Sequence, residues 1–372
     1  MPASAAQVFG PITVDPGFTT IGEKTLLTMN TTLPPGGKNV IIVAYLNNSI
    51  LITIPANGTF RIKKGSTILY ETPIANEYLV WSTHEPRMFI VVDESPAGND
   101  VYTFTINISN AGSATTTVHV QGIVIKTDDA SYARTTSLVS VSSGATASIL
   151  SLSTAFPAGS KVAVLAFAVG NWSTTAGGNT LIGAGNVRLK LDTAVVSSNQ
   201  FSIGAYGLYT GAIFTLHASL PYFATVTTST QTWSIEVYNN SARAFSFYAG
   251  IVAFTVFDGA FLDTASVSLS NGVQVTVGNL TTTLEGDAVV IGIGTAENTS
   301  STQVVAFNAG DVVLQKGNSS VGQISLGVGW NLGNNTEWNR SGMLTLFRID
   351  TNVTNPSYQI KMTARTSGIN GE

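Results

Sequence analysis

The side chains of this chain that could take part in catalysis are few and lie far apart in the sequence. Histidine commonly transfers protons or binds metals, but His84, His119 and His217 never occur at the spacing of a ligand pair. The G-x-S-x-G pattern of a hydrolase nucleophile is absent from the sequence. The glycine pairs at 183–185 and 292–294 lack the strand-then-helix context of a nucleotide-binding loop. We therefore expect no catalytic residue, no cofactor and no cofactor-binding residue.

Acidic residues gather at two places where strands are expected to end. Asp93 and Glu94 lie close to Asp100, and Asp128 adjoins Asp129. Carboxylate oxygens in a loop can bind calcium, and two carboxylates from different strands can hydrolyse a glycosidic bond. Ordinary solvated turns account for the same residues, and this is the interpretation that we favour, so we expect no metal site.

The tryptophans offer a second route to carbohydrate. Trp172, Trp330 and Trp338 could form an exposed platform for sugar rings. Trp81 and Trp233 lie in alternating strand patterns, which predicts that they belong to the core. A carbohydrate-binding or glycan-active protein is therefore a hypothesis with scattered support.

The most distinctive local feature is a high density of N-x-S/T sequons. Serine- and threonine-rich turns produce some of them by composition alone, but their density is typical of a surface exposed outside a cell, including an archaeal or viral surface. The candidate N-glycosylation sites are Asn30, Asn47, Asn57, Asn107, Asn171, Asn239, Asn279, Asn298, Asn318, Asn334, Asn339 and Asn352.

Composition excludes several classes of partner. Charged residues make up 10% of the 372 residues, against roughly 25% in typical soluble domains. The net charge is −4 and the basic residues are scattered, so we expect no nucleic-acid partner. The longest apolar runs fall short of the roughly 20 residues that a membrane span needs, and the first residues show no signal-peptide pattern. The chain contains no cysteine, which excludes disulfides and thiolate metal sites.

The elements that must position all of these residues are short strands arranged in a repeat. The segment Ser148–Val169 reads as an alternating strand, a Pro-Ala-Gly-Ser turn and a second, more apolar strand, and it resembles a hairpin. Related segments occur at Thr25–Leu46 and Gln274–Thr295. The first of these contains Pro34-Pro35-Gly36-Gly37, which cannot be helical and favours positive φ at the glycines. Regular spacing of this kind indicates three copies of one domain.

The repeat predicts an all-β chain of three tandem antiparallel β-sandwiches. We expect an N-terminal arm at residues 1–10 and sandwich domains at 11–130, 131–260 and 261–372. Short strands with dense turns fit either an immunoglobulin-like or a jelly-roll topology, and the strand count favours the jelly roll. The third unit is expected to lack its last strand. An exposed sheet edge invites pairing, so another segment or subunit, such as the N-terminal arm, could fill it.

Tandem cysteine-free jelly rolls with few charges and many sequons resemble the turret or vertex-spike proteins of turreted icosahedral archaeal viruses of Sulfolobus. The resemblance covers the whole chain through the three units that begin near Thr25, Ser148 and Gln274, and it rests on architecture and composition. It implies a non-enzymatic virion subunit on the capsid surface. It also implies a homo-oligomer, a pentamer at a fivefold vertex, that contacts other capsid proteins and a host surface receptor. It transfers no site residue.

The sequence thus supports three hypotheses about function. The leading one is a structural or attachment subunit of a virion. The second is a cell-surface S-layer, fibre or adhesin protein built from β-sandwiches, against which the absence of a signal-peptide pattern argues. The third is a carbohydrate-binding or glycan-active protein.

Overall fold

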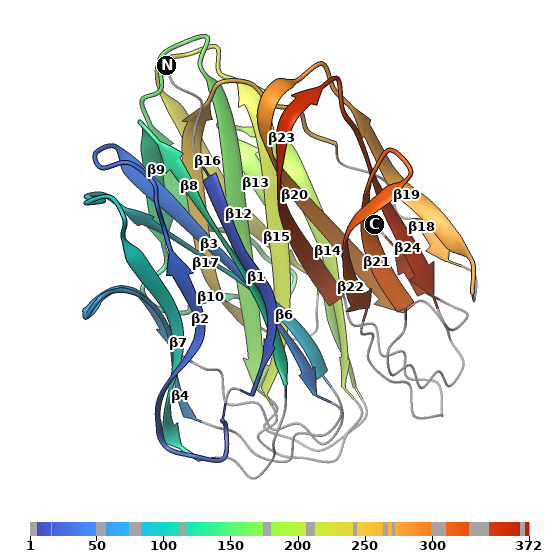
Figure 1. Cartoon of the computed structure of the whole chain (residues 1–372). Helices are drawn as coiled ribbons and strands as arrows, with labels where there is room; N and C mark the ends of the chain where they lie inside the picture. Colours follow the sequence, from blue (N-terminus) through green and yellow to red (C-terminus); the bar gives the residue numbers. More distant parts are fainter. Residues whose placement is uncertain are drawn as a thin grey trace.

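Among the residues that the computed structural model describes, all regular secondary structure is β-strand (Figure 1). None of these residues lies in a helix that is long and apolar enough to cross a membrane. The described residues are 6–15, 17–49, 57–73, 83–111, 117–173, 180–205, 213–240, 244–262, 267–269, 272–298, 310–326, 342–364 and 369–371.

The first unit contains two four-stranded sheets, with the orders β1-β8-β3-β6 and β2-β7-β4-β5. Its strands are β1 (Ala6–Val14), β2 (Gly22–Asn30), β3 (Lys38–Ser49), β4 (Asn57–Lys64), β5 (Thr67–Pro73), β6 (Thr83–Asp93), β7 (Val101–Asn110) and β8 (Val118–Thr127).

The second unit repeats this plan with the orders β10-β17-β12-β15 and β11-β16-β13-β14, and β9 adds a fifth strand to the first of these sheets. Its strands are β9 (Ala130–Arg134), β10 (Val139–Val141), β11 (Thr146–Thr154), β12 (Lys161–Ser173), β13 (Thr180–Leu191), β14 (Ala194–Ala205), β15 (Ile213–Thr225), β16 (Gln231–Asn239) and β17 (Phe245–Val256).

The third unit has the orders β18-β25-β20-β23 and β19-β24-β21-β22. Its strands are β18 (Val267–Leu269), β19 (Gln274–Thr281), β20 (Glu285–Asn298), β21 (Gly310–Lys316), β22 (Ser319–Leu326), β23 (Gly342–Thr354), β24 (Ser357–Ala364) and β25 (Ile369–Gly371).

The pairing pattern identifies each unit as a jelly roll. In the first unit β1 pairs with β8, β2 with β7, β3 with β6 and β4 with β5, as in one long hairpin rolled up on itself. The second unit has the equivalent antiparallel pairs, β10 with β17, β11 with β16, β12 with β15 and β13 with β14. In the third unit the equivalent pairs are β18 with β25, β19 with β24, β20 with β23 and β21 with β22. The predicted fold class of three tandem antiparallel β-sandwiches is confirmed. The strand order also decides for the jelly roll over the immunoglobulin-like topology.

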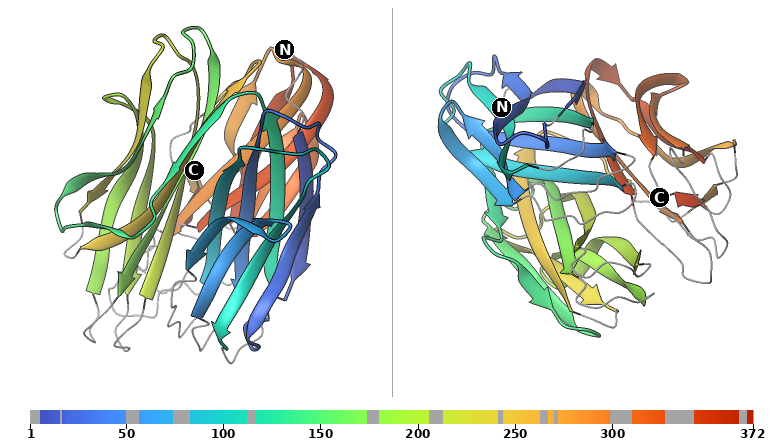
Figure 2. Two further views of the ribbon diagram at one scale, coloured as in Figure 1. Left: turned by 90° about the vertical axis from the view of Figure 1, so that its left-hand side faces the viewer. Right: turned by 90° about the horizontal axis from the view of Figure 1, so that it is seen from below.

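The three units are arranged around a common centre, as the view from below shows (Figure 2). One apolar cluster joins them, with Ile42 and Ile123 from the first unit, Phe167 and Val252 from the second and Phe347 from the third. Antiparallel sheets commonly leave one face to solvent. Here the outer face of the first sheet of a unit packs against its neighbours, so that sheet is apolar on both faces. This arrangement explains the nearly continuous apolar runs in β3, β8, β12 and β17.

The second sheet of each unit follows the ordinary alternating pattern. In β16 every other residue is buried, and Trp233, Ile235 and Val237 point into the core of the second sandwich. The predicted core position of Trp233 is thereby confirmed. The turn before β3 also matches its prediction, because φ is +75° at Gly36 and +56° at Gly37.

Three expectations about boundaries and turns are corrected by the structure. Residues 6–10 are not an arm but the first half of β1, in which Ala6 lies opposite Ile125 of β8. The last strand of the third unit is not missing altogether, because β25 occupies its place with three residues. Ser148–Val169 is not a hairpin, because β11 and β12 belong to the two facing sheets of the sandwich.

Candidate functional site

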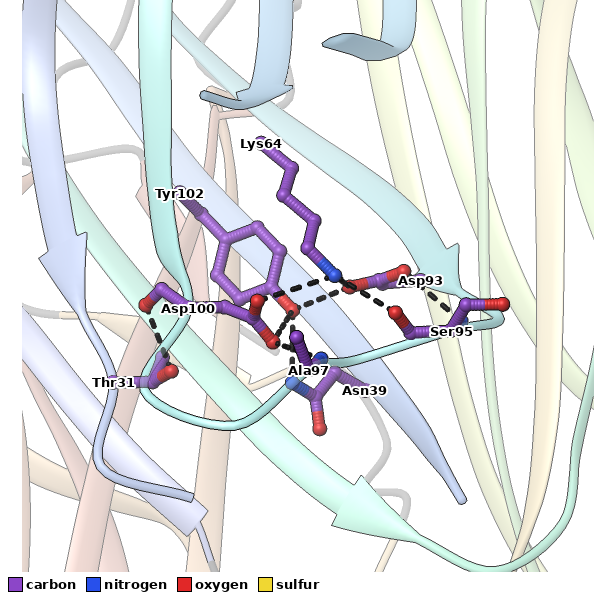
Figure 3. Close-up of polar contacts among 8 residues, drawn as sticks. All are labelled: Thr31, Asn39, Lys64, Asp93, Ser95, Ala97, Asp100 and Tyr102. Carbon is purple, nitrogen blue, oxygen red and sulfur yellow. Dashed lines mark hydrogen bonds and ion pairs between the residues drawn. The ribbon is translucent and has the colours of Figure 1, made fainter. Parts of the chain in front are cut away.

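A buried cluster of charged residues lies at one end of the first sandwich (Figure 3). It contains Asp93 at the end of β6 and Asp100 just before β7, the two carboxylates that the sequence brings together. The other central members are Lys64 and Tyr102, which lie opposite one another on the neighbouring strands β4 and β7 of the second sheet. Both carboxylate side chains are 6% exposed, so this is a buried site and not a solvated turn.

Every charged group in the cluster has partners. The Lys64 Nζ atom lies 2.8 Å from Asp93 Oδ2 and 3.2 Å from Asp100 Oδ1. The Tyr102 hydroxyl donates to Asp93 Oδ2 at 2.7 Å and accepts from Asn39 Nδ2 at 2.8 Å. Backbone N–H groups of the connecting loop complete the shell, because Ser95 donates to Asp93 at 3.1 Å and Ala97 donates to Asp100 at 3.0 Å.

These contacts set the protonation states of the cluster. Burial alone would raise the pKa of Asp93, but hydrogen bonds from Lys64, Tyr102 and the Ser95 amide outweigh it and hold the pKa below its usual value. Burial and the adjacent Asp93 carboxylate raise the pKa of Tyr102. Burial lowers the pKa of Lys64 by itself, yet the hydrogen bonds to Asp93 and Asp100 outweigh it and raise the pKa. The site therefore holds the ionised Asp93 carboxylate against the charged ammonium group of Lys64.

This arrangement does not suit either of the two chemical roles that the carboxylates suggested. A calcium ion would need the oxygens that now accept from Lys64, and the ammonium group already supplies the positive charge between them. Glycoside hydrolysis needs one carboxylic acid whose pKa is raised, whereas Asp93 is shifted in the opposite direction. The cluster is thus a structural ion pair that ties the end of β6 to the second sheet.

A related ion-pair cluster, with one carboxylate and two cations, occurs in the third unit. Tyr358 donates its hydroxyl hydrogen to Asp350 Oδ2 at 2.8 Å, and Lys316 Nζ lies 3.4 Å from the same oxygen. Arg348 adds a second cation against Asp350, whose side chain is 2% exposed. The register equates Lys316 and Tyr358 with Lys64 and Tyr102, since each pair lies opposite one another in the sheet.

The second unit replaces this cluster with apolar side chains. Its register places Leu191 opposite Trp233, in the positions of Lys64 and Tyr102. The Trp233 indole donates to Thr154 Oγ1 at 3.2 Å and is 0% exposed. One position in the fold is therefore an ion pair in two units and an apolar contact in the other, which argues for a structural role in all three.

The remaining acidic candidates do not join the cluster. Glu94 is exposed and pairs with Lys38 at 2.7 Å, and Asp128 and Asp129 are exposed as well. Among the described residues, no group of three or more histidine, aspartate or glutamate side chains could hold a metal ion.

Of the three histidines, the structure describes only the side chain of His119. His119 Nδ1 lies 2.9 Å from Thr13 Oγ1, and burial lowers the pKa of His119. The side chains of His84, His217, Trp81, Trp172, Trp330 and Trp338 lie outside the described residues.

The sequons fall into three groups. Asn239 is 0% exposed, and its Nδ2 donates to the carbonyls of Val141 at 2.9 Å and Ser142 at 3.2 Å, so it cannot carry a glycan in the folded chain. This removes one candidate. Asn107 is half-buried, whereas the exposed candidates are Asn30, Asn279, Asn318 and Asn352. The side chains outside the described residues are Asn47, Asn57, Asn171, Asn298, Asn334 and Asn339.

Sequence reasoning missed the cations that neutralise the buried carboxylates and the tyrosines that donate hydrogen bonds to them. A signal for them existed, because Lys64 and Lys316 both precede the glycine that ends a repeated strand, Gly65 and Gly317. It also missed Gln121, whose amide accepts from the Phe347 N–H at 3.1 Å and donates to the Phe347 carbonyl at 2.9 Å. No pattern in the sequence points to that contact, which joins the first and third units.

Comparisons with known proteins assign the chain to no family. No protein-family model and no curated protein matches it. Among solved structures it is similar to PNGF-II, with 8% identity, a TM-score of 0.32 and coverage of 64% of this chain and 60% of that one. The chain thus spans about three fifths of PNGF-II.

Two viral structures are also similar. One describes the triple jelly roll fold and turret assembly in an archaeal virus, with 11% identity, a TM-score of 0.19 and coverage of 93% and 80%. The other is the major capsid protein P2 from bacteriophage PM2, with 9% identity, a TM-score of 0.26 and coverage of 69% and 100%. Because all of these TM-scores are below 0.5, we assign neither a family nor a function from them.

Proposed function

We propose that the chain is a structural, non-enzymatic subunit of a virion that forms part of a turret or spike at a capsid vertex. In this role five copies surround the vertex, contact other capsid proteins and present a surface to a host receptor. The resemblance in composition and repeat pattern motivates the turret, and the arrangement of the three units supports an architectural role.

The observation that carries the proposal is the shared apolar core at the centre of the three jelly rolls. Ile42, Phe167 and Phe347 come from three different units and are all buried in it. A chain whose domains move independently would leave these faces polar. Fusion of the units into one body suits a protein whose task is to hold a shape in an assembly.

The chemistry of the described residues supports the same proposal. The buried carboxylates Asp93 and Asp350 are both occupied by cations and tyrosine hydroxyls, so neither is free to transfer a proton to a substrate. The exposed sequons at Asn30, Asn318 and Asn352 suit glycosylation of an outward-facing surface.

Mass spectrometry of the native source tests this function. We expect to find the chain in purified particles, with a number of copies at each vertex that is divisible by five. A low-resolution image of the particle should show a projection at each vertex. Recovery of the chain in the cell envelope, with none in particles, would support the S-layer or adhesin hypothesis and overturn the virion proposal.

A further inference from the structure

One end of the first jelly roll is closed by the loops that follow β2 and β6. Thr31, just after β2, donates its backbone N–H to the Asp100 carbonyl at 2.9 Å and its hydroxyl to the same carbonyl at 2.8 Å (Figure 3). Asn99 donates its N–H to the Leu33 carbonyl at 3.4 Å. The two loops are thereby held against each other.

The third jelly roll closes the equivalent end in the same way. Thr282, just after β19, donates its N–H to the Pro356 carbonyl at 3.0 Å, and Asn355 donates to the Leu284 carbonyl at 3.0 Å. Asn99 and Asn355 also share a positive φ, +52° and +47°. The two ends are therefore built on one plan.

A buried carboxylate ties the closing loop of the first unit to its second sheet. Asp93 accepts from the Ser95 N–H of the loop at 3.1 Å, and it binds the Lys64 ammonium group at 2.8 Å and the Tyr102 hydroxyl at 2.7 Å. A carboxylate that joins a loop to a sheet in this way holds the end closed only while it is ionised.

Asp350 has the same task in the third unit. It accepts from the Tyr358 hydroxyl at 2.8 Å, lies 3.4 Å from Lys316 Nζ and pairs with Arg348. Burial alone would raise the pKa of Asp350, but the hydrogen bonds from Tyr358 and Arg348 outweigh it and hold the pKa below its usual value.

The second unit closes its end with a side chain that does not titrate. Gln231 lies two residues before Trp233, as Asp100 lies two residues before Tyr102. The Gln231 amide is 1% exposed and donates to the Phe156 carbonyl, in the loop after β11, at 3.2 Å. A neutral amide thus joins the loops that depend on carboxylates in the other two units.

We propose that Asp93 and Asp350 form an acid-sensitive latch, which keeps the ends of the first and third jelly rolls closed and releases both at low pH. The end of the second jelly roll stays closed, because Gln231 has no charge to lose. Protonation of Asp93 or Asp350 removes the negative charge to which Lys64 or Lys316 is bound, so the closing loops lose their tie to the second sheet.

The groups that face the carboxylates set the direction of this response. Asp93 faces Lys64 of β4 and Tyr102 of β7, with Asp100 beside them and Lys126 of β8 at longer range. Asp350 faces Lys316 of β21, Tyr358 of β24 and Arg348 of its own strand. The cations keep their charge as the pH falls, so loss of the carboxylate charge leaves them uncompensated.

The pKa shifts give the pH range of the latch. The pKa of Asp93 and that of Asp350 are lower in the folded than in the unfolded chain. Their stabilisation is therefore complete above about pH 3.9 and is lost as the pH falls toward the folded pKa. Each pH unit in that range weakens the closed state about tenfold for each carboxylate.

Hydrogen exchange of the full chain, measured peptide by peptide at about pH 5.5 and about pH 2.5, tests the latch. The rates are corrected for the chemical effect of pH on exchange. We expect protection in residues 94–102 and 351–358 to fall at least about tenfold at the lower pH, and protection in residues 225–233 to change less than about twofold.

Variants assign the response to single carboxylates. Asp350→Asn keeps the shape of the protonated side chain, so it should open the end of the third unit already at about pH 5.5 and leave the response of the first unit unchanged. Glu236→Gln is the matched control. Glu236 pairs with Arg188 at 3.4 Å and Lys190 at 3.2 Å in the second unit, away from the closing loops, so this variant should exchange as the native chain does.

Two results with the native chain would overturn the latch. Equal loss of protection in all three units at low pH would show that closure does not depend on Asp93 and Asp350, and unchanged protection in the first and third units would show the same. Native exchange in Asp350→Asn at about pH 5.5 would remove Asp350 from the latch. None of these results bears on recovery of the chain in particles, which tests the proposed function separately.

Discussion

Replacement of Lys64 by methionine should destabilise the first jelly roll strongly, although the side chain keeps nearly the same length. Methionine removes the positive charge that lies 2.8 Å from Asp93 and 3.2 Å from Asp100, and both carboxylates remain buried. Loss of one partner of a buried ion pair costs about 3–5 kcal/mol. Lys64 itself is 23% exposed, so water relieves part of the penalty and we expect about 3 kcal/mol.

Urea unfolding followed by circular dichroism measures this loss, and Lys63→Met is the matched control. Lys63 is the preceding residue of β4 and pairs at 2.9 Å with Glu23, whose side chain is 33% exposed. Removal of such a surface pair costs at most about 1 kcal/mol. Equal losses in the two variants would refute the reasoning, because they would show that burial of Asp93 and Asp100 carries no penalty.

The pH dependence of the same two proteins provides a second readout. The pKa of Asp93 is lower in the folded than in the unfolded chain, so the unfolded chain binds more protons as the pH falls below about 3.9. The stabilisation by the cluster is therefore complete above that pH and is lost as the pH falls toward the folded pKa. In Lys64→Met, burial of Asp93 dominates, and this acid-side loss should disappear.

Three further predictions concern single side chains. Gln121→Leu leaves the buried N–H and carbonyl of Phe347 unpaired, so it should lower the free energy of unfolding by about 2 kcal/mol and speed hydrogen exchange in β23. Unchanged exchange in β23 would show that Gln121 does not hold the first and third units together. Asn239→Ala should cost a similar amount, about 2 kcal/mol by thermal unfolding, because the carbonyls of Val141 and Ser142 lose their donor, and glycopeptide analysis should find no sugar at Asn239. Lys126→Met should stabilise the chain by about 1–3 kcal/mol, because Lys126 Nζ is buried without a hydrogen-bond partner among the described residues and burial lowers the pKa of Lys126. A melting temperature below that of the native chain would contradict this prediction.

The local patterns of the chain predict its strands well and its pairings poorly. The alternation around Ser148–Val169 indicates two strands and a turn, and β11 and β12 occur there. The same alternation is compatible with two strands that pair and with two strands that face each other across a core. In the structure β11 and β12 lie in different sheets, because the jelly roll pairs strands that are distant in the sequence.

The carboxylate cluster shows a similar division. The sequence places Asp93 near Asp100, but it does not show whether they point to solvent or inward. Tyr102 and Lys64 decide this, because β7 and β4 are neighbours only after the second sheet has formed. Asn239 is a second example. Its sequon has no feature that distinguishes it from the others, and only the folded structure shows that its side chain is bonded to the backbone of Val141 and Ser142.

Local sequence patterns predict the all-β class, the threefold repetition and the apolar composition of the central strands, because these depend on side-chain periodicity and turn chemistry over short stretches. Three other properties are visible only in the folded chain: the outer faces of the units meet in one core, β25 pairs with β18 and β20, and Gln121 binds the Phe347 backbone between the first and third units. These properties depend on contacts between residues that are tens to hundreds of positions apart, and a local sequence pattern cannot predict such contacts.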